Sequence, residues 1–407
     1  MKDSTFITRV VLRNYKSIPV CDVQLQPLTF LVGPNGAGKS NFLDALRFVA
    51  DALRSSLDHA LRDRGGINDV RRRSGGHPNH FGIRLDFTLP KGATGHYAFR
   101  IIARERGGYE VQSEECVIQD AQLFGPKKYF RVVNGEVTSA SVDVAPVAAY
   151  NRLYLVSASG LPEFQPVYEA FSRMGFYNFN SDKIRDLQIP ETGDMLRRDG
   201  SNLTSVLARF SRTTKQHVEE YLAKIVPGIH GVRVKELGHR ETLEFRQRMA
   251  GAKYPWRFLA NNMSDGTLRA LGILVALFQG NYDAQYRIML VGVEKPEIAF
   301  HPAALGVLLD ALRDAAGKTQ IILTSHSPDL LDNKDLDAAS ILAVEARDGN
   351  TAIAQVDKTG KSVLRDQLST TGELLRRNQL RPDAAPTVST ADTPQLQLFS
   401  SEKTDSE

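Results

Sequence analysis

The sequence predicts an α/β fold in which a parallel sheet carries a phosphate-binding loop. Residues 33–40 read GPNGAGKS, a complete G-x-x-x-x-G-K-[ST] pattern. The run before it, Leu28–Val32, is short and apolar, as a buried parallel strand should be. After it, residues 42–49 place apolar side chains at helical spacing, so the loop opens a helix whose N-terminus faces an anion. Strand, loop and helix therefore occur in the order that phosphate binding requires.

Each residue type in the loop has a chemical reason. Glycines let the backbone turn tightly enough for its N–H groups to surround a phosphate, Lys39 reaches the β- and γ-phosphates, and the Ser40 hydroxyl ligates Mg²⁺. The alternative is a glycine-rich turn that binds nothing. The predicted nucleotide-binding residues of the loop are Gly33, Pro34, Asn35, Gly36, Ala37, Gly38, Lys39, Ser40 and Asn41.

The remaining elements follow in order. Two strands joined by a turn are expected in 5–32, one helix in 41–62, and an antiparallel meander from about 81 to 144. A mainly helical stretch covers 150–226, in which an Asp or Ser of 199–203 would cap the helix that follows. The later elements are strands in 231–260, a helix in 267–280, a strand ending at Glu294, a helix in 303–316 and a strand in 319–327.

Composition restricts the class of protein. The 407 residues are 24% charged and 42% hydrophobic with a net charge of +4, values that are ordinary for a globular protein and that permit nucleic acid as a partner without arguing for it. Two cysteines suggest no disulfide framework, and no run approaches the roughly 18 apolar residues of a membrane span. We therefore expect a cytoplasmic protein without a membrane partner.

Three later segments suit the same site. Glu294 ends a buried strand, where an acid that supports Mg²⁺ belongs. Ser264, Asp265 and Gly266 form a turn that offers a hydroxyl, backbone N–H groups and a helix dipole to a phosphate. His326 ends another strand and can polarise a γ-phosphate. Taken singly, each has a structural alternative: a surface acid, a capped helix, a buried histidine.

With these segments in order, the chain resembles RecF/SMC-like ATPases of the ABC superfamily, in the stand-alone prokaryotic AAA family ATPase group. The resemblance is carried by VLRNY at 11–15, the loop, MSDGT at 263–267, VGVEKPEIAFHP at 291–302, TSHSP at 324–328 and TTGELLRRNQL at 370–380. It implies an ABC-type head formed by 1–60 and 240–380. An insertion, 61–239, would have an antiparallel β part at 81–145 and a helical part at 150–230, and 381–407 would be a disordered tail.

The resemblance also implies ATP and Mg²⁺ as cofactors and a head-to-tail homodimer. In such dimers the nucleotide lies between the loop of one copy and the signature turn of the other, so Ser264, Asp265 and Gly266 would act on a partner's γ-phosphate. Ser40 and Glu294 would support the metal. A Mg²⁺-sensing glutamine is expected at Gln112 or Gln119, and spacing does not choose between them.

One position departs from the family pattern. The family usually has two adjacent acids before the proline, and the second orients the attacking water. Here that position is Lys295, which cannot accept a proton while charged. Glu297, two residues on, is a candidate to restore the function. The predicted catalytic group is therefore Glu294, Lys295, Glu297 and His326, with tight ATP binding and slow hydrolysis.

Two further segments suggest partners. Gln395–Phe399 reads QLQLF and resembles the peptide with which bacterial proteins dock onto the sliding clamp; the alternative is that its apolar residues dock on the chain's own surface. Arg71–Arg73, with Arg62 and Arg64, could contact DNA or form a solvated face.

The leading hypothesis is thus an ATPase acting in DNA repair or in defence against phage and plasmids. The alternative is an ATP-gated sensor or scaffold that holds a separately encoded effector such as a nuclease. A transporter ATPase is disfavoured, because its signature usually begins Leu-Ser-Gly-Gly.

Overall fold

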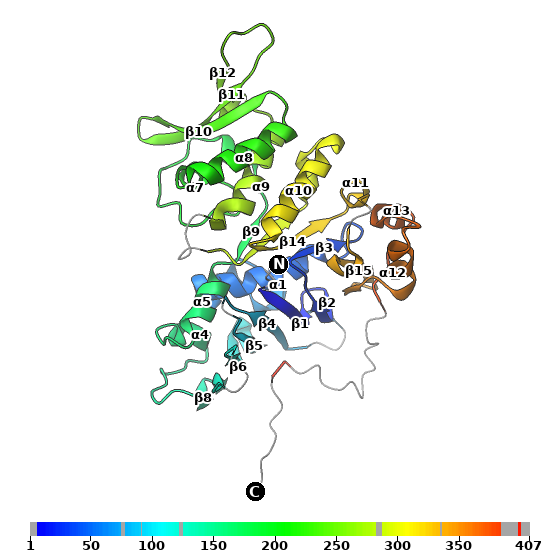
Figure 1. Ribbon diagram of the computed structural model, residues 1–407. Helices are drawn as coiled ribbons and strands as arrows, with labels where there is room; N and C mark the ends of the chain where they lie inside the picture. The colour runs from blue at the N-terminus through cyan, green and yellow to red at the C-terminus, as the bar shows by residue number, and fades with distance from the viewer. Residues whose placement is uncertain are drawn as a thin grey trace.

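The computed structural model describes residues 6–74, 78–90, 92–121, 125–281, 287–333, 336–383 and 398–399. Its elements form stacked layers (Figure 1). A seven-stranded sheet is followed by helix α1, a six-stranded sheet, helices α9 and α10, helix α8 and a small three-stranded sheet. This is the α/β architecture expected from the loop and its flanking segments. Among the described residues, no helix has both the length and the apolar character needed to cross a bilayer.

The seven-stranded sheet is antiparallel and has the order β2-β1-β4-β5-β6-β7-β8. The predicted meander is confirmed, and two earlier strands extend it. Its strands are β1 (Ile7–Tyr15), β2 (Ile18–Gln24), β4 (His80–Thr88), β5 (Thr94–Ala103), β6 (Tyr109–Gln119), β7 (Lys128–Val133) and β8 (Glu136–Ala140).

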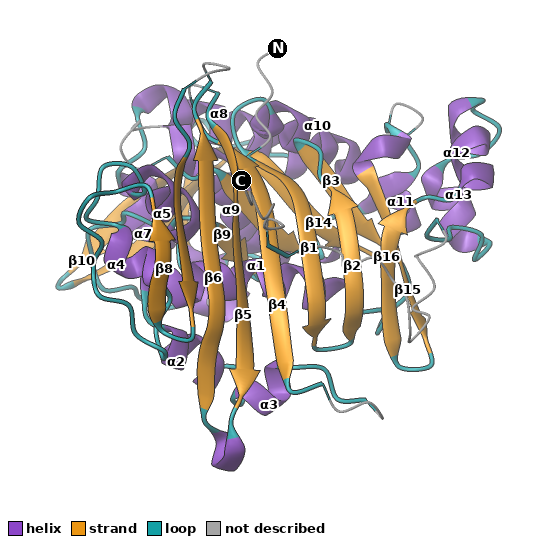
Figure 2. Ribbon diagram, turned by 90° about the horizontal axis from the view of Figure 1, so that it is seen from below, coloured by secondary structure: helices purple, strands orange, loops and turns teal. Residues whose placement is uncertain are grey.

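The six-stranded sheet carries the phosphate loop and has the order β16-β15-β3-β14-β13-β9. Strands β15, β3, β14, β13 and β9 run parallel, and β16 pairs antiparallel with β15. Its members are β3 (Leu28–Val32), β9 (Gly175–Tyr177), β13 (Leu290–Glu294), β14 (Gln320–Ser325), β15 (Ile341–Arg347) and β16 (Asn350–Gln355). Edge strand β2 contacts edge strand β16, so the two sheets meet side by side there (Figure 2).

Helix α1 (Lys39–Arg54) lies between the two large sheets, because most of its side chains are apolar and buried on both sides. Helices α9 (Asp265–Phe278) and α10 (Leu305–Ala316) cover the opposite face of the six-stranded sheet. The other helices are α2 (Leu57–Arg62), α3 (Ile67–Val70), α4 (Tyr154–Ala158), α5 (Gln165–Ser172), α6 (Ser181–Arg185), α7 (Leu203–Ala208), α8 (Arg212–Ile225), α11 (Pro328–Leu331), α12 (Lys358–Arg365) and α13 (Thr371–Arg376).

The third sheet, β10-β11-β12, lies beyond α7 and α8 at the far end of the molecule (Figure 1). Its strands are β10 (Ile229–Leu237), β11 (Arg240–Gln247) and β12 (Trp256–Leu259). The predicted limits of head and insertion stay a prediction. In the structure β1 and β2 share a sheet with β4–β8, and β9 joins the parallel sheet.

Four local predictions were wrong. The helix expected over 41–62 is interrupted, because Ser56 caps a new helix by accepting from His59 N. The second strand of 5–32 is two strands, β2 and β3, which belong to different sheets. The helical stretch contains β9, which is too short for a periodic pattern to reveal. The N-cap of α7 is Asn202, without a side-chain capping bond, rather than an Asp or Ser.

Candidate functional site

The phosphate loop connects β3 to α1. Gly38 is the N-cap of α1 with φ 102°, and a Cβ atom there would overlap the Thr351 side chain of β16, so position 38 requires glycine. Pro34, Asn35 and Gly36 are exposed, as is Ser40 in the first turn of the helix. The loop therefore presents its backbone and one hydroxyl to solvent at the positive end of a 16-residue helix.

Lys39 is buried beneath this loop. Its Nζ donates to Gly33 O at 2.7 Å and to Pro34 O at 2.9 Å. Burial and, to a lesser extent, the charge of Lys295 lower the pKa of Lys39 to about 8, and Glu297 opposes the shift. The ammonium is thus held against neutral carbonyls, an arrangement in which an arriving anion would be strongly favoured.

The carboxyl ends of β13 and β14 meet the loop at one edge of the sheet, since β3, β14 and β13 are parallel neighbours. Lys295 follows β13 in a left-handed conformation, φ 46°, which is uncommon for a non-glycine residue and typical of functional sites. Its backbone N donates to Thr324 O at 3.0 Å. Its Nζ donates to Asn35 Oδ1 at 3.3 Å, so a cation reaches the phosphate loop from the position where the family usually has an acid.

Glu297 and His326 lie together behind this edge. Glu297 is 7% exposed, and its Oε1 accepts from Ser325 Oγ at 2.9 Å and from His326 N at 3.2 Å. The Nδ1 atom of His326 lies 3.5 Å from the same oxygen. Within the described residues, Glu297 Oε2 and His326 Nδ1 are buried without a hydrogen-bond partner. Buried polar atoms without a partner are rare in folded proteins, and a catalytic role is one of the reasons for them.

Arg198 is a site residue that the sequence prediction missed. Its Nη2 donates to Glu294 Oε1 at 2.8 Å, although the two residues are far apart in the chain. The loop that carries Arg198 is fixed beyond β9 by a bond from Asn178 N to Arg198 O at 3.0 Å. Arg198 precedes the 199–203 segment, and no motif distinguishes it from its neighbour Arg197, so only tertiary structure could identify it.

The signature turn lies apart from the loop of its own chain. Ser264 caps α9 by accepting from Thr267 N, and both Ser264 and Asp265 are exposed. Asp265 pairs with Arg185 of α6, and its hydrogen bonds to Arg185 and Ser181 lower the pKa of this carboxyl. Within the described part of the chain, no recorded hydrogen bond or ion pair links the turn to residues 33–41.

Several secondary candidates make contacts within the chain itself. The side chain of Asn41 donates to Ser17 Oγ at 2.7 Å, and that of Gln119 to Gly125 O at 3.0 Å, at the far end of β6. Arg64 cannot contact DNA, because its side chain is 2% exposed and pairs with Asp44 and Asp51. Arg71, Arg72 and Arg73 each bond to groups of the chain itself.

The predicted tail motif is only partly described. Gln395–Gln397 and most of 381–407 lie outside the described residues. Leu398 is 2% exposed and packs on the seven-stranded sheet, the alternative that the sequence left open.

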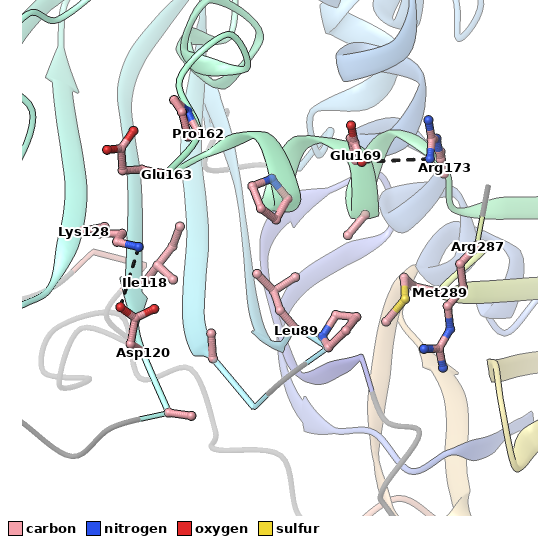
Figure 3. Close-up of a pocket in the computed structure, with 15 residues that line it drawn as sticks. Leu89, Ile118, Asp120, Lys128, Pro162, Glu163, Glu169, Arg173, Arg287 and Met289 are labelled. Atoms are coloured by element: carbon pink, nitrogen blue, oxygen red, sulfur yellow. Dashed lines mark ion pairs between the residues drawn. The ribbon is translucent and has the colours of Figure 1, made fainter. Parts of the chain in front are cut away.

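A separate cavity of about 390 Å³ lies between α5, the β4–β5 turn, β6 and the segment before β13 (Figure 3). Its rim carries the ion pairs Lys128–Asp120 and Glu169–Arg173, over an apolar floor that includes Leu89, Ile118 and Met289. No phosphate-loop residue lines it. The cavity is therefore distinct from the candidate nucleotide site.

Comparison with known proteins now assigns the chain. The family model described as "AAA domain, putative AbiEii toxin, Type IV TA system" matches residues 28–106 and 147–332, more than half of the chain. The chain belongs to this family. The match includes the phosphate loop, the signature turn and the ends of β13 and β14, so the AAA-domain assignment rests on the elements that build the site.

Two curated relatives agree with this AAA-domain assignment. The OLD nuclease of Thermus scotoductus is 23% identical over 371 residues, 88% of this chain and 66% of the relative. The DNA replication and repair protein RecF of Aliivibrio fischeri is 39% identical over 54 residues, 12% of this chain and 15% of the relative. The chain thus spans just under two thirds of the first relative and a small part of the second.

Solved structures identify the fold. An SMC head bound to the C-winged helix domain of ScpA gives a TM-score of 0.55 at 15% identity, covering 88% of this chain and 99% of that one. The SMC head of Pyrococcus furiosus, with an extended coiled coil, gives a TM-score of 0.55 at 12% identity. The match covers 89% of this chain and 99% of the Pyrococcus furiosus chain. The AAA-domain chain therefore has a RecF/SMC-like, ABC-type ATPase head fold, as the sequence resemblance implied.

Proposed function

We propose that this chain binds Mg²⁺-ATP at the carboxyl edge of the six-stranded sheet and hydrolyses it slowly. One observation carries the proposal: several charged groups lie together at one edge of the six-stranded sheet. They are the phosphate loop with Lys39, the carboxylates of Glu294 and Glu297, and the ammonium of Lys295. Cations and backbone N–H groups suit a triphosphate, and the two acids suit a metal and a water.

The residues present fit a magnesium-bound nucleotide. The loop backbone and Lys39 would hold the β- and γ-phosphates, and the exposed Ser40 hydroxyl with Glu294 would hold the metal. Magnesium would neutralise charge that develops on the phosphate oxygens. Ser40 is free to do this because it is exposed, whereas Glu294 first has to exchange its contact with Arg198.

Slow hydrolysis follows from the chemistry of position 295. A charged lysine attracts phosphate and cannot take a proton from water. The nearest buried carboxylate is Glu297, whose free Oε2 beside His326 makes this pair the best remaining candidate to orient water. We infer that Glu297 and His326 supply a residual rate and that Lys295 contributes to nucleotide binding.

We also propose an ATP-dependent head-to-tail homodimer. In the turn Ser264–Gly266, Ser264 and Asp265 are exposed; Ser264 bonds to Thr267 of its own helix and Asp265 pairs with α6. The turn is therefore available to a second copy. Two half-sites would then enclose one triphosphate, with Ser264 and the N-terminus of α9 facing the γ-phosphate.

The biological role that we propose is DNA repair or defence against phage and plasmids. The names of the relatives, OLD nuclease and DNA replication and repair protein RecF, support a role connected with DNA. DNA, a sliding clamp bound through Gln395–Phe399 and a separately encoded nuclease or other effector are the proposed partners. Lys295 favours a second candidate, an ATP-gated scaffold that holds such an effector while hydrolysis is incidental.

Calorimetry tests the proposal directly. ATP and an unhydrolysable analogue, each with Mg²⁺, should bind the wild-type chain, and light scattering should report a doubled mass with nucleotide. Lys39→Ala should lose binding, whereas Ser264→Arg should bind nucleotide as a monomer. Absence of binding heat with both nucleotides would refute the site, and a constant mass would refute only the dimer.

A further inference from the structure

The outer face of the seven-stranded sheet has a hollow at Gly82 on β4. Phe81 and Ile83 are buried, and Phe81 packs on Phe48 of α1, so Gly82 faces away from the helix. Arg13 lies opposite Gly82 on β1 and Arg100 lies opposite it on β5. The hollow therefore lies between Arg13 and Arg100 on the neighbouring strands. Figure 2 is viewed from the side of the seven-stranded sheet that faces away from α1.

Leu398 fills this hollow. A Cβ atom at position 82 would lie 2.5 Å from Leu398 Cδ1, so the leucine sits directly over the glycine, and only 2% of it is exposed. Glycine weakens a strand interior, and a close approach of another segment is a physical reason to have it there. In Figure 1 the described pair, Leu398 and Phe399, lies below the sheet on the side away from α1.

Two arginines fix the pair further. Arg84 Nη1 donates to Leu398 O at 3.3 Å, and the Arg100 guanidinium carbon lies 5.6 Å from the centre of the Phe399 ring. The second distance is within the range of a cation–π contact. One apolar contact, one backbone hydrogen bond and one ring contact therefore recognise two consecutive residues.

The charges of this face favour an aromatic occupant. Burial lowers the pKa of Arg13 and of Arg100, the Arg13 pKa being lowered also by Arg100. His80 lies in the same field, and its pKa is lowered by burial and by both arginines. Arg84 has a carboxylate partner in Asp86, whereas Arg13 Nε and Arg100 Nε are buried without a hydrogen-bond partner among the described residues. An aromatic ring offers such desolvated cations an electron-rich face.

We propose that this face of β1, β4 and β5 is a peptide-binding site whose internal ligand is the chain's own Leu398–Phe399, and that docking withholds this pair from partner proteins. The docking of Leu398–Phe399 does not depend on the proposed function. The withholding of this pair from a sliding clamp rests on the clamp contact put forward there. The same two side chains cannot fill the Gly82 hollow and a pocket on another protein at once. If the pair is docked nine-tenths of the time, its apparent affinity for a partner falls about tenfold.

A fluorescent label at Ser401→Cys tests docking in the full chain, because Cys21 and Cys116 are buried and react poorly. Label anisotropy should be high in the parent and fall in Leu398→Ala and in Gly82→Val, whose added side chain occupies the hollow. Val388→Ala, which removes apolar atoms elsewhere in the tail, is the matched control and should change nothing. Excess peptide of residues 392–403 should lower the anisotropy of the parent, and the same peptide with Phe399→Ala should not.

Equal anisotropy in parent, Leu398→Ala and Gly82→Val would overturn the proposal, as would dependence on protein concentration, which indicates exchange between copies. Thermal melting of Gly82→Val checks its fold, and Leu398→Ala leaves the sheet untouched. With purified sliding clamp, Gly82→Val should bind about tenfold more tightly than the parent. If no variant binds clamp, the clamp partner fails while the anisotropy result still decides the docking.

Discussion

Arg198 donates a hydrogen bond from Nη2 to Glu294 Oε1 at 2.8 Å, joining the loop beyond β9 to the acid at the end of β13. The arginine side chain is 45% exposed and the glutamate side chain 25%. A partly exposed cation therefore holds the carboxylate on which metal support is proposed to depend. Because the pair is partly exposed, its net contribution is modest, about 0.2–1 kcal/mol.

Replacing Arg198 should consequently tighten metal binding a few-fold. In Arg198→Gln, Glu294 no longer has to exchange a guanidinium for Mg²⁺, so the Mg²⁺ concentration at half-saturation should fall by about 1.4- to fivefold, the factor that corresponds to about 0.2–1 kcal/mol. A Mg²⁺ titration of nucleotide binding at fixed ATP measures this.

The neighbouring Arg197→Gln is the control, since Arg197 pairs with Glu191 and not with Glu294. It should leave the Mg²⁺ titration unchanged. If the Mg²⁺ concentration at half-saturation fell in both variants, the cause would be a general charge effect. If it rose in Arg198→Gln, competition between Arg198 and Mg²⁺ for Glu294 would be contradicted.

The contrast between Lys39 and Arg198 defines what the sequence could predict. Lys39 lies in a local motif whose strand, loop and helix are contiguous, so its place in the site follows from spacing alone. Glu294 and His326 were predictable because parallel strands bring their carboxyl ends to one edge. Arg198 reaches that edge from a loop beyond a three-residue strand, β9, and neither feature has a periodic signal.

The same reasoning explains the two tail possibilities. The sequence suggested an apolar pair that required a partner, and it could not choose between another protein and the chain itself. The choice depends on Gly82 and Arg100, which are more than 290 residues away and whose role is visible only in the folded sheet. Long-range pairings of this kind are invisible to local patterns.

Lys295→Glu should raise steady-state ATP turnover. The substitution restores a carboxylate where water would be oriented, a contribution that is typically about 10²–10⁴-fold. It should also weaken ATP binding, because one cation near the loop is lost. Phosphate release under saturating ATP measures the rate. Lys295→Gln removes the charge without adding a base, so a gain confined to the Glu variant identifies the base, and equal rates in parent and Lys295→Glu would contradict the idea.

ATP binding should weaken as pH rises through about 8. Burial and Lys295 lower the pKa of Lys39 to about 8 in the free protein, whereas bound phosphates would raise it. Near pH 8 nucleotide binding should therefore take up protons, which calorimetry in buffers of different ionisation enthalpy detects. Lys295→Gln should move the weakening to higher pH, since one cause of the lowered pKa is gone. Binding that stays constant from pH 7 to 9.5 would contradict this assignment.

Acid should destabilise the fold through Asp44 on α1. Burial alone would raise the pKa of this carboxyl, but Arg64, Lys16 and Arg47 outweigh it and lower the pKa from 3.8 to about 2. The lowered pKa stabilises the folded state by about 2 kcal/mol at pH values above the unfolded pKa. That contribution is lost as the pH falls from about 4 to 2, because in this range the unfolded chain binds the proton more readily than the folded chain does.

Asp44→Asn should therefore reduce the free energy of unfolding by about 3 kcal/mol or more at pH 7, since it leaves the buried Arg64 with one carboxylate, Asp51. The difference from the parent should shrink below pH 4. Urea unfolding at pH 7, 4 and 2.5 measures both effects. Asp58→Asn, which breaks an exposed pair with Arg62, is the control and should cost at most about 0.5 kcal/mol. If the loss of unfolding free energy in Asp44→Asn did not change with pH, its cause would be altered packing and not the lost charge.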